Sequence, residues 1–226
     1  MDAAQAYSTT RANLLDVARS LDADDGELPV AALPGWTVKN AYAHLAGLCA
    51  DVLDGNLRGA GTPPWTAVQV AARADASLDD VSAEWARRGP DLDDWIRAAD
   101  PARTMFIPLD AWNHEQDIRA TVGLACVHDD ARVAYLASLA RAAFDRRFRE
   151  ASVSALRLAN AEDGTEFVLG DGDPGATLRI SDYELLRVFS ARRSRAQMYA
   201  ADWIGDPEPF VDHLHLFELP VADLTD

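Results

Sequence analysis

Apolar residues recur at intervals of three and four through the first two-thirds of the chain, and this spacing predicts a series of amphipathic helices. The clearest run follows Thr37, a residue type favoured at the N-cap, and Gly55 closes it. Further helices are predicted over residues 3–21, 68–76, 78–88 and 90–95, from Pro108 to a stop at Gly123, and from Asp129 to about residue 150.

The period changes after Ala151, where short strand-like segments separated by turns replace the long helical patterns. Strands are predicted over residues 153–158, 166–169 and 176–180, and helices over residues 182–190 and 209–217. The chain is therefore predicted to be α+β, with a helical bundle at residues 1–150 and a small α+β domain at residues 151–226.

Charge and composition exclude several classes of function. The 37 acidic residues outnumber the 21 basic ones, which argues against nucleic acid or an anionic membrane surface as a partner. No apolar run approaches the roughly 18 residues of a spanning helix, and the first ten residues lack the features of a signal peptide. Cys49 and Cys126 form no CxxC motif, so they are expected to be buried apolar residues of a cytoplasmic protein.

A possible metal site lies on the segment that follows Pro108. Asp110 and His114 are four residues apart, so they share one face of the predicted helix and can both reach one divalent ion. A histidine from a neighbouring helix would complete a set of three ligands with open positions for water or substrate. The spacing alone is more typical of a solvated charged face, and His44 alone is more typical of a core or boundary histidine.

Three further charged residues have two interpretations each. Asp117, three residues after His114, either accepts the second ring N–H of that histidine or pairs with a surface arginine. Arg192 and Arg193, near a predicted helix end, either complement the helix dipole and form salt bridges or bind the carboxylate of a ligand. The sequence does not identify the catalytic residues, and Arg192 and Arg193 are candidates for this role. Trp36 and Trp112, beside the possible ligands, are expected in the core.

Two segments resemble the signatures of a known family. LPGWTVKNAYAHLAG at residues 33–47 and WNHEQDIRATVG at residues 112–123 are similar to motifs of the mycothiol-dependent maleylpyruvate isomerase family, part of the DinB-like superfamily. Residues 185–207 resemble its smaller domain. The resemblance implies a DinB-like four-helix bundle with an appended α/β domain. It also implies a divalent metal, usually zinc, bound by His44, Asp110 and His114.

One position departs from the family pattern, because Asp110 stands where the family usually has glutamate. The shorter side chain leaves three possibilities open: a shifted helix, a different metal, or a weakened or lost site. The resemblance implies a metal-assisted isomerase or S-transferase that uses mycothiol, a low-molecular-weight thiol, on a small electrophilic substrate. The alternatives are a non-catalytic small-molecule-binding or scaffold protein, and a metal-dependent hydrolase that needs no thiol.

Overall fold

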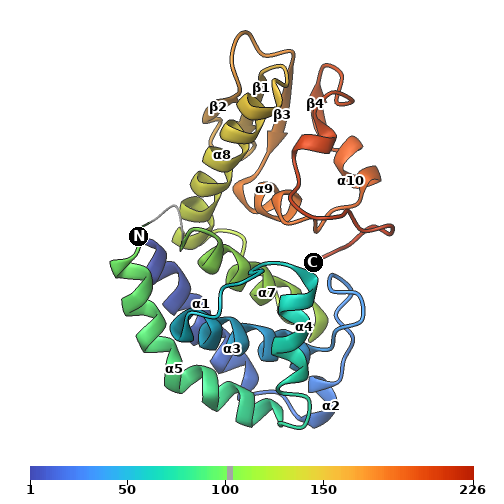
Figure 1. Cartoon of the computed structure of the whole chain (residues 1–226). Helices are drawn as coiled ribbons and strands as arrows, with labels where there is room; N and C mark the ends of the chain where they lie inside the picture. Colours follow the sequence, from blue (N-terminus) through green and yellow to red (C-terminus); the bar gives the residue numbers. More distant parts are fainter. Residues whose placement is uncertain (101–103) are drawn as a thin grey trace. The chain divides into compact units, whose positions relative to one another are not determined.

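The computed structural model describes residues 1–100 and 104–226, which form two compact units. The first comprises Met1–Cys126 with Asp226, and the second comprises Val127–Thr225 (Figure 1). The division lies before the long helix α8 (Ala131–Ala151), whereas the sequence predicts a boundary near residue 150. Helix α8 belongs to the second unit because it packs against helix α9 (Asp182–Phe189) and strand β2 (Glu166–Leu169).

The first unit is a bundle of four long helices, as the resemblance implies. They are α1 (Ala3–Ala18), α3 (Val38–Asp54), α5 (Leu78–Ala98) and α7 (Phe106–Thr121). Helices α1 and α3 each pack against both α5 and α7. The shorter helices α2 (Ala23–Gly26) and α4 (Pro63–Ala71) also belong to the unit, and α4 lies against α3.

Helix α3 has the bounds that the sequence predicts, because both of its ends are capped by local contacts. The Thr37 side chain accepts a hydrogen bond from the Asn40 backbone N–H, and the Asn40 side chain accepts one from the Thr37 N–H. Gly55 ends the helix with a positive φ of 74°, which glycine adopts without strain. These caps fix the residues of α3 that face the rest of the bundle.

The predicted break between residues 88 and 90 is wrong, because α5 runs continuously through Pro90. Proline removes one backbone hydrogen bond, but the apolar face on either side of it is buried in one continuous stripe. The stripe consists of Leu78, Val81, Trp85, Leu92 and Ile96. Burial of this face therefore outweighs the local preference for a break.

Other predicted bounds shift by a few residues. Helix α4 begins at Pro63 instead of residue 68, since proline is tolerated in the first turn, where its missing N–H has no helical partner. Pro108 lies inside the first turn of α7, and Asp130 rather than Asp129 caps α8. The predicted helix at residues 209–217 is wrong over most of its length, because only Val211–His213 is helical, as a 3₁₀ turn.

The second unit contains a four-stranded sheet with the order β2-β1-β3-β4. Strands β1 (Leu156–Asn160) and β3 (Ala176–Ile180) are parallel, and the outer strands β2 and β4 (Asp202–Ile204) are antiparallel to their neighbours. Strand β4 and helix α10 (Arg195–Tyr199) are too short to give a hydrophobic pattern, and the sequence does not predict them.

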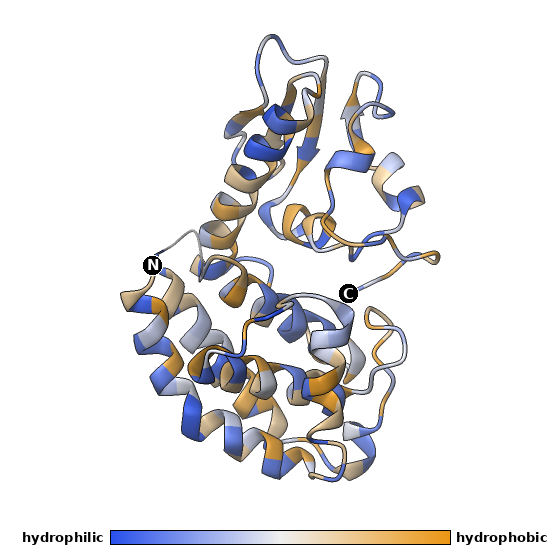
Figure 2. Cartoon of the chain, viewed as in Figure 1, coloured by the Kyte–Doolittle hydropathy of each residue, from blue (hydrophilic) through white to orange (hydrophobic). Residues whose placement is uncertain are grey.

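Apolar and polar residues are mixed along the long helices (Figure 2). Within the described residues, no helix is both long and apolar enough to cross a membrane.

Candidate metal centre

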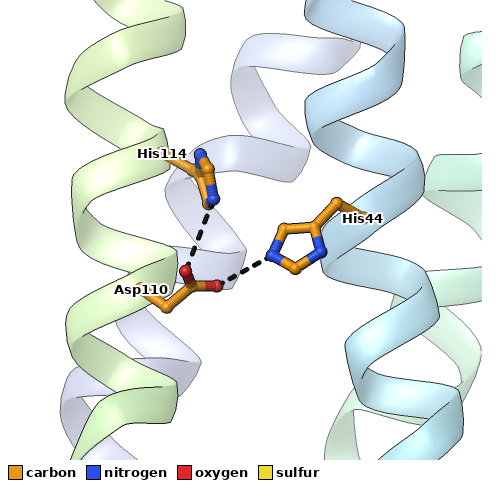
Figure 3. A group of neighbouring side chains, drawn as sticks. All are labelled: His44, Asp110 and His114. Atoms are coloured by element: carbon orange, nitrogen blue, oxygen red, sulfur yellow. Dashed lines mark hydrogen bonds and ion pairs between the residues drawn. The ribbon is translucent and has the colours of Figure 1, made fainter. Parts of the chain in front are cut away.

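Helices α3 and α7 bring together the three residues for which the resemblance implies a metal-binding role (Figure 3). Asp110 and His114 lie one turn apart on α7, and His44 faces them from α3. Their nitrogen and oxygen ligand atoms all lie within 4.8 Å of one another. In the part of the chain that the structure describes, no other group of three histidine, cysteine or acidic residues is clustered in this way.

The Asp110 carboxylate bridges the two imidazoles. His44 Nε2 lies 3.2 Å from Asp110 Oδ2, and His114 Nε2 lies 3.5 Å from Asp110 Oδ1 (Figure 3). Zinc ligands bonded at about 2.0–2.1 Å in a tetrahedron lie about 3.3–3.4 Å apart. The shorter aspartate thus reaches both histidines, and two imidazoles with one carboxylate are a donor set that fits a divalent metal such as zinc.

The site is closed around the histidines and open at the carboxylate. Both imidazoles are nearly buried, whereas 35% of the Asp110 side chain remains exposed. The Trp36 ring lies 5.3 Å from the His44 ring and 6.2 Å from the His114 ring, measured between centroids. Trp112 is buried in the core as predicted, but Trp36 is half-buried and forms a wall of the site. The exposed carboxylate leaves a direction from which water or a ligand can approach.

The ring nitrogens that face away from the carboxylate have different surroundings. His44 Nδ1 lies 2.7 Å from Oε1 of Gln69, a buried residue of α4. His114 Nδ1 lies 3.6 Å from Asp117 Oδ2, beyond hydrogen-bonding distance, and has no hydrogen-bond partner among the described residues. Asp117 therefore flanks His114 without a hydrogen bond to it, and its supporting role stays a prediction. Sequence analysis missed Gln69, because no spacing relates a residue of α4 to one of α3.

The cluster shifts the pKa values of two of its members in opposite directions. Burial opposes ionisation of Asp110, but the neighbouring imidazoles of His114 and His44 outweigh it and hold the Asp110 pKa far below its usual range. Burial also opposes protonation of His114, but the Asp110 carboxylate outweighs it and raises the His114 pKa to about 9. Without a metal, an ion pair between Asp110 and His114 therefore holds this part of α7 at neutral pH.

A zinc ion held by this cluster would have to displace the proton from His114, so its affinity is expected to rise with pH. A raised histidine pKa stabilises the metal-free protein fully below the unfolded value of about 6.5, and this contribution is lost as pH rises through about 9. The lowered Asp110 pKa contributes stability above an unfolded value of about 3.9, which is lost only in strong acid. Between about pH 7 and 8.5, we expect the apparent affinity for zinc to increase about tenfold per pH unit.

Competition with a chromophoric chelator at pH 7.0, 7.75 and 8.5 would measure this increase. Calorimetry in two buffers of different ionisation enthalpy should show release of about one proton per zinc at pH 7.5. An affinity independent of pH, with no proton released, would mean that zinc binds without displacing the His114 proton and would contradict the candidate site.

The two candidate arginines lie in the second unit, between α9 and α10. Both are buried, and the Arg193 guanidinium donates to both carboxylate oxygens of Glu184, at 2.8 and 2.6 Å. Arg192 Nη1 donates to the backbone oxygen of Ser190 at 2.7 Å. For Arg193, the ion pair with Glu184 is a salt bridge of the kind expected if this arginine has a structural role. Ligand binding by either arginine stays a prediction.

Comparison with known proteins identifies similarity at the level of the fold. No family profile and no curated protein matches the sequence. Among solved structures, the mycothiol-dependent maleylpyruvate isomerase is similar with a TM-score of 0.58 and 14% identity, over 82% of this chain and 86% of that one. A histidine-to-alanine mutant of the isomerase gives a TM-score of 0.56 and 13% identity over the same shares. The predicted α+β class, with a bundle like that of the isomerase, is confirmed.

Proposed function

We propose that this protein is a metal-assisted enzyme that uses a low-molecular-weight thiol, mycothiol. It either isomerises a small electrophilic substrate or, as an S-transferase, attaches the thiol to that substrate. The observation that carries the proposal is the His44–Asp110–His114 cluster, closed around the imidazoles and open at the carboxylate. The fold that holds the cluster is shared with a mycothiol-dependent maleylpyruvate isomerase. The proposed ion is zinc, because two imidazoles and one carboxylate with an open position are typical of catalytic zinc sites.

A bound divalent ion would supply positive charge that lowers the pKa of a thiol and favours its thiolate at neutral pH. His44, Asp110 and His114 would hold the ion, and the Trp36 ring would exclude water from one side of it. Of the two cysteines of the chain, Cys49 is poorly suited to supply the thiol. Cys49 is buried in the bundle core, and burial raises the pKa of its thiol to about 11.

Two reactions share the same first step, in which the thiolate adds to an electrophilic carbon of the substrate. In an isomerase, addition to an activated double bond leaves a single bond that rotates, and expulsion of the thiolate then restores the double bond. In a transferase, the new carbon–sulfur bond remains, and the displaced electron pair either takes up a proton from water or departs with a leaving group of the substrate. The isomerase therefore regenerates its thiol, whereas the transferase consumes one thiol for each substrate molecule.

The test is an assay of the zinc-loaded protein with mycothiol and either maleylpyruvate or a panel of small electrophiles. We expect turnover that stops when mycothiol is omitted and when zinc is removed by a chelator. Free thiol should stay constant for an isomerase and fall in step with product for a transferase. Turnover without thiol would favour a hydrolase, and a zinc-loaded protein without any turnover would favour a binding protein on the same fold.

We further propose that the protein acts in the cytoplasm on small molecules. Both cysteines are free in the structure, which agrees with a reducing compartment. The formal net charge of −16 makes nucleic acid an unfavourable partner, because a protein that binds phosphate needs a basic surface. The predicted partners are therefore the thiol and the electrophilic substrate.

A further inference from the structure

We propose that Gln69 is a positioning residue that directs the Nε2 atom of His44 toward the metal site, and that Gly47 is the residue that makes room for it. The inference rests on the proposed metal site, and it assigns a role to helix α4. This helix is not one of the four long helices of the bundle, and no motif in the sequence predicted its contacts with α3.

Gln69 is held between two polar residues of α3. Only 3% of Gln69 is exposed. Its Oε1 lies 2.7 Å from His44 Nδ1, and its Nε2 donates to Asp51 Oδ2 at 2.7 Å. Since His44 and Asp51 are seven residues apart, they lie two turns apart on one face of α3, and the amide spans the gap between them.

The Asp51 carboxylate determines which end of the amide faces the histidine. An ionised carboxylate only accepts hydrogen bonds, so it must face the NH₂ group of Gln69. The reverse orientation would place the amide oxygen against the carboxylate. Asn56 Nδ2 also donates to Asp51, at 2.9 Å to Oδ1, and holds the carboxylate in place.

The amide in turn determines the role of each His44 nitrogen. Because Gln69 Oε1 only accepts, His44 Nδ1 must carry a hydrogen and donate it. This leaves Nε2, the atom that faces Asp110, as the nitrogen that binds the ion. The chain from Asp51 through Gln69 therefore specifies both the orientation of the ring and the nitrogen that serves as ligand.

Gly47 allows α4 to come close enough for this contact. A Cβ atom at Gly47 would lie 2.5 Å from Gln69 Cβ and 2.8 Å from Gln69 Cγ. Because the Gln69 Cβ atom is fixed to the backbone, it cannot move aside without moving α4. Arg73, just after α4, lies close to the same point, because its Nη1 would be 3.0 Å from a Cβ atom at Gly47. Its guanidinium donates to both carboxylate oxygens of Glu84 on α5 and to the Gln69 backbone oxygen, and so ties the end of α4 to α5.

The test compares four variants with the wild type. Gln69→Leu removes both hydrogen bonds at similar volume, Gln69→Glu restores an acceptor for His44, Asp51→Asn removes the constraint on the amide, and Gly47→Ala displaces α4. We expect zinc to bind about 10- to 100-fold more weakly to Gln69→Leu and Gly47→Ala. Gln69→Glu should stay closer to the wild type than Gln69→Leu, and Asp51→Asn should fall between the wild type and Gln69→Leu.

A second measurement needs no metal. Long-range ¹H–¹⁵N spectra of the histidines in the zinc-free protein should show a protected Nδ1–H on His44, which is lost in Gln69→Leu. A purely structural glutamine would lower the unfolding temperature without changing zinc affinity or this resonance. Two results would overturn the proposal. In the first, Gln69→Leu binds zinc as tightly as the wild type and keeps the Nδ1–H resonance of His44. In the second, His44 of the wild-type protein carries no hydrogen on Nδ1.

The two proposals can fail separately. If the wild type binds no zinc, the proposed function fails, whereas the spectrum of the zinc-free protein still decides whether Gln69 orients His44. Circular dichroism would reveal whether Gln69→Leu folds. If it does not, two other measurements decide whether Gln69 orients His44: the spectrum of the wild type, and the order of the zinc affinities of the wild type, Gln69→Glu and Asp51→Asn. Equal affinities of these three proteins would contradict the proposed role of the amide.

Discussion

Alanine in place of His114 is expected to lower the bound zinc from about one ion per chain to almost none. His114 supplies one of three ligand atoms, and its Nε2 lies 3.5 Å from the Asp110 carboxylate on the same face of α7. Loss of one ligand of three should weaken binding at least about 10²- to 10³-fold. Elemental analysis of protein purified without a metal-affinity column, followed by chelator competition, would measure both effects.

A matched control is His128→Ala, which removes a histidine from the second unit. His128 stacks on Tyr183 with ring centroids 3.9 Å apart and is not part of the cluster. This variant should bind zinc as the wild type does. Full zinc content in His114→Ala would place the ion elsewhere in the chain. A wild type that remains zinc-free even after zinc is added would mean that Asp110 does not support the site, and the binding-protein alternative would then be preferred.

Replacement of Trp85 by alanine should give the largest loss of stability in the bundle. Trp85 is fully buried on α5, its Nε1 donates to the Tyr7 hydroxyl at 2.7 Å, and its ring meets the edges of Tyr7 and Tyr42. Removal of the indole leaves a cavity and takes away the hydrogen bond that Trp85 donates to the buried Tyr7 hydroxyl. We expect the free energy of unfolding to fall by about 3–5 kcal/mol.

Urea denaturation of the zinc-free protein, followed by circular dichroism, would measure this loss. Trp85→Phe keeps most of the ring but removes the donor, so it should cost less, about 1–3 kcal/mol. Phe217→Ala is the control, because Phe217 is an exposed aromatic residue and its loss should change the free energy by no more than about 0.5 kcal/mol. Equal effects of Trp85→Ala and Phe217→Ala would contradict the placement of Trp85 in the core.

The elements that the sequence predicted well are those with strong local signals. Helix α3 begins after Thr37 and ends before Gly55, since the capping contacts and the positive φ involve residues close together in the chain. Strands β2 and β3 also have the predicted bounds. In each case the pattern that predicts the element is made by the residues that form it.

The wrong predictions occurred where contacts between elements outweigh local preference. Pro90 favours a break, but burial of the α5 face on both sides keeps the helix continuous. Helix α8 lies within the predicted boundary of the bundle, yet its contacts with α9 and β2 place it in the second unit. A prediction from local pattern does not contain these contacts, because they join segments that are distant in the chain.

The candidate site combines both kinds of information. The sequence alone determined that Asp110 and His114 share a face of one helix, since this depends only on helical geometry over four residues. The family resemblance added His44. Only the tertiary structure placed His44 beside Asp110, Gln69 behind His44, and the Trp36 ring against both imidazoles. The contacts of His44 join residues 66 and 25 positions apart, and they exist only because burial of the apolar faces packs α3 against α7 and α4.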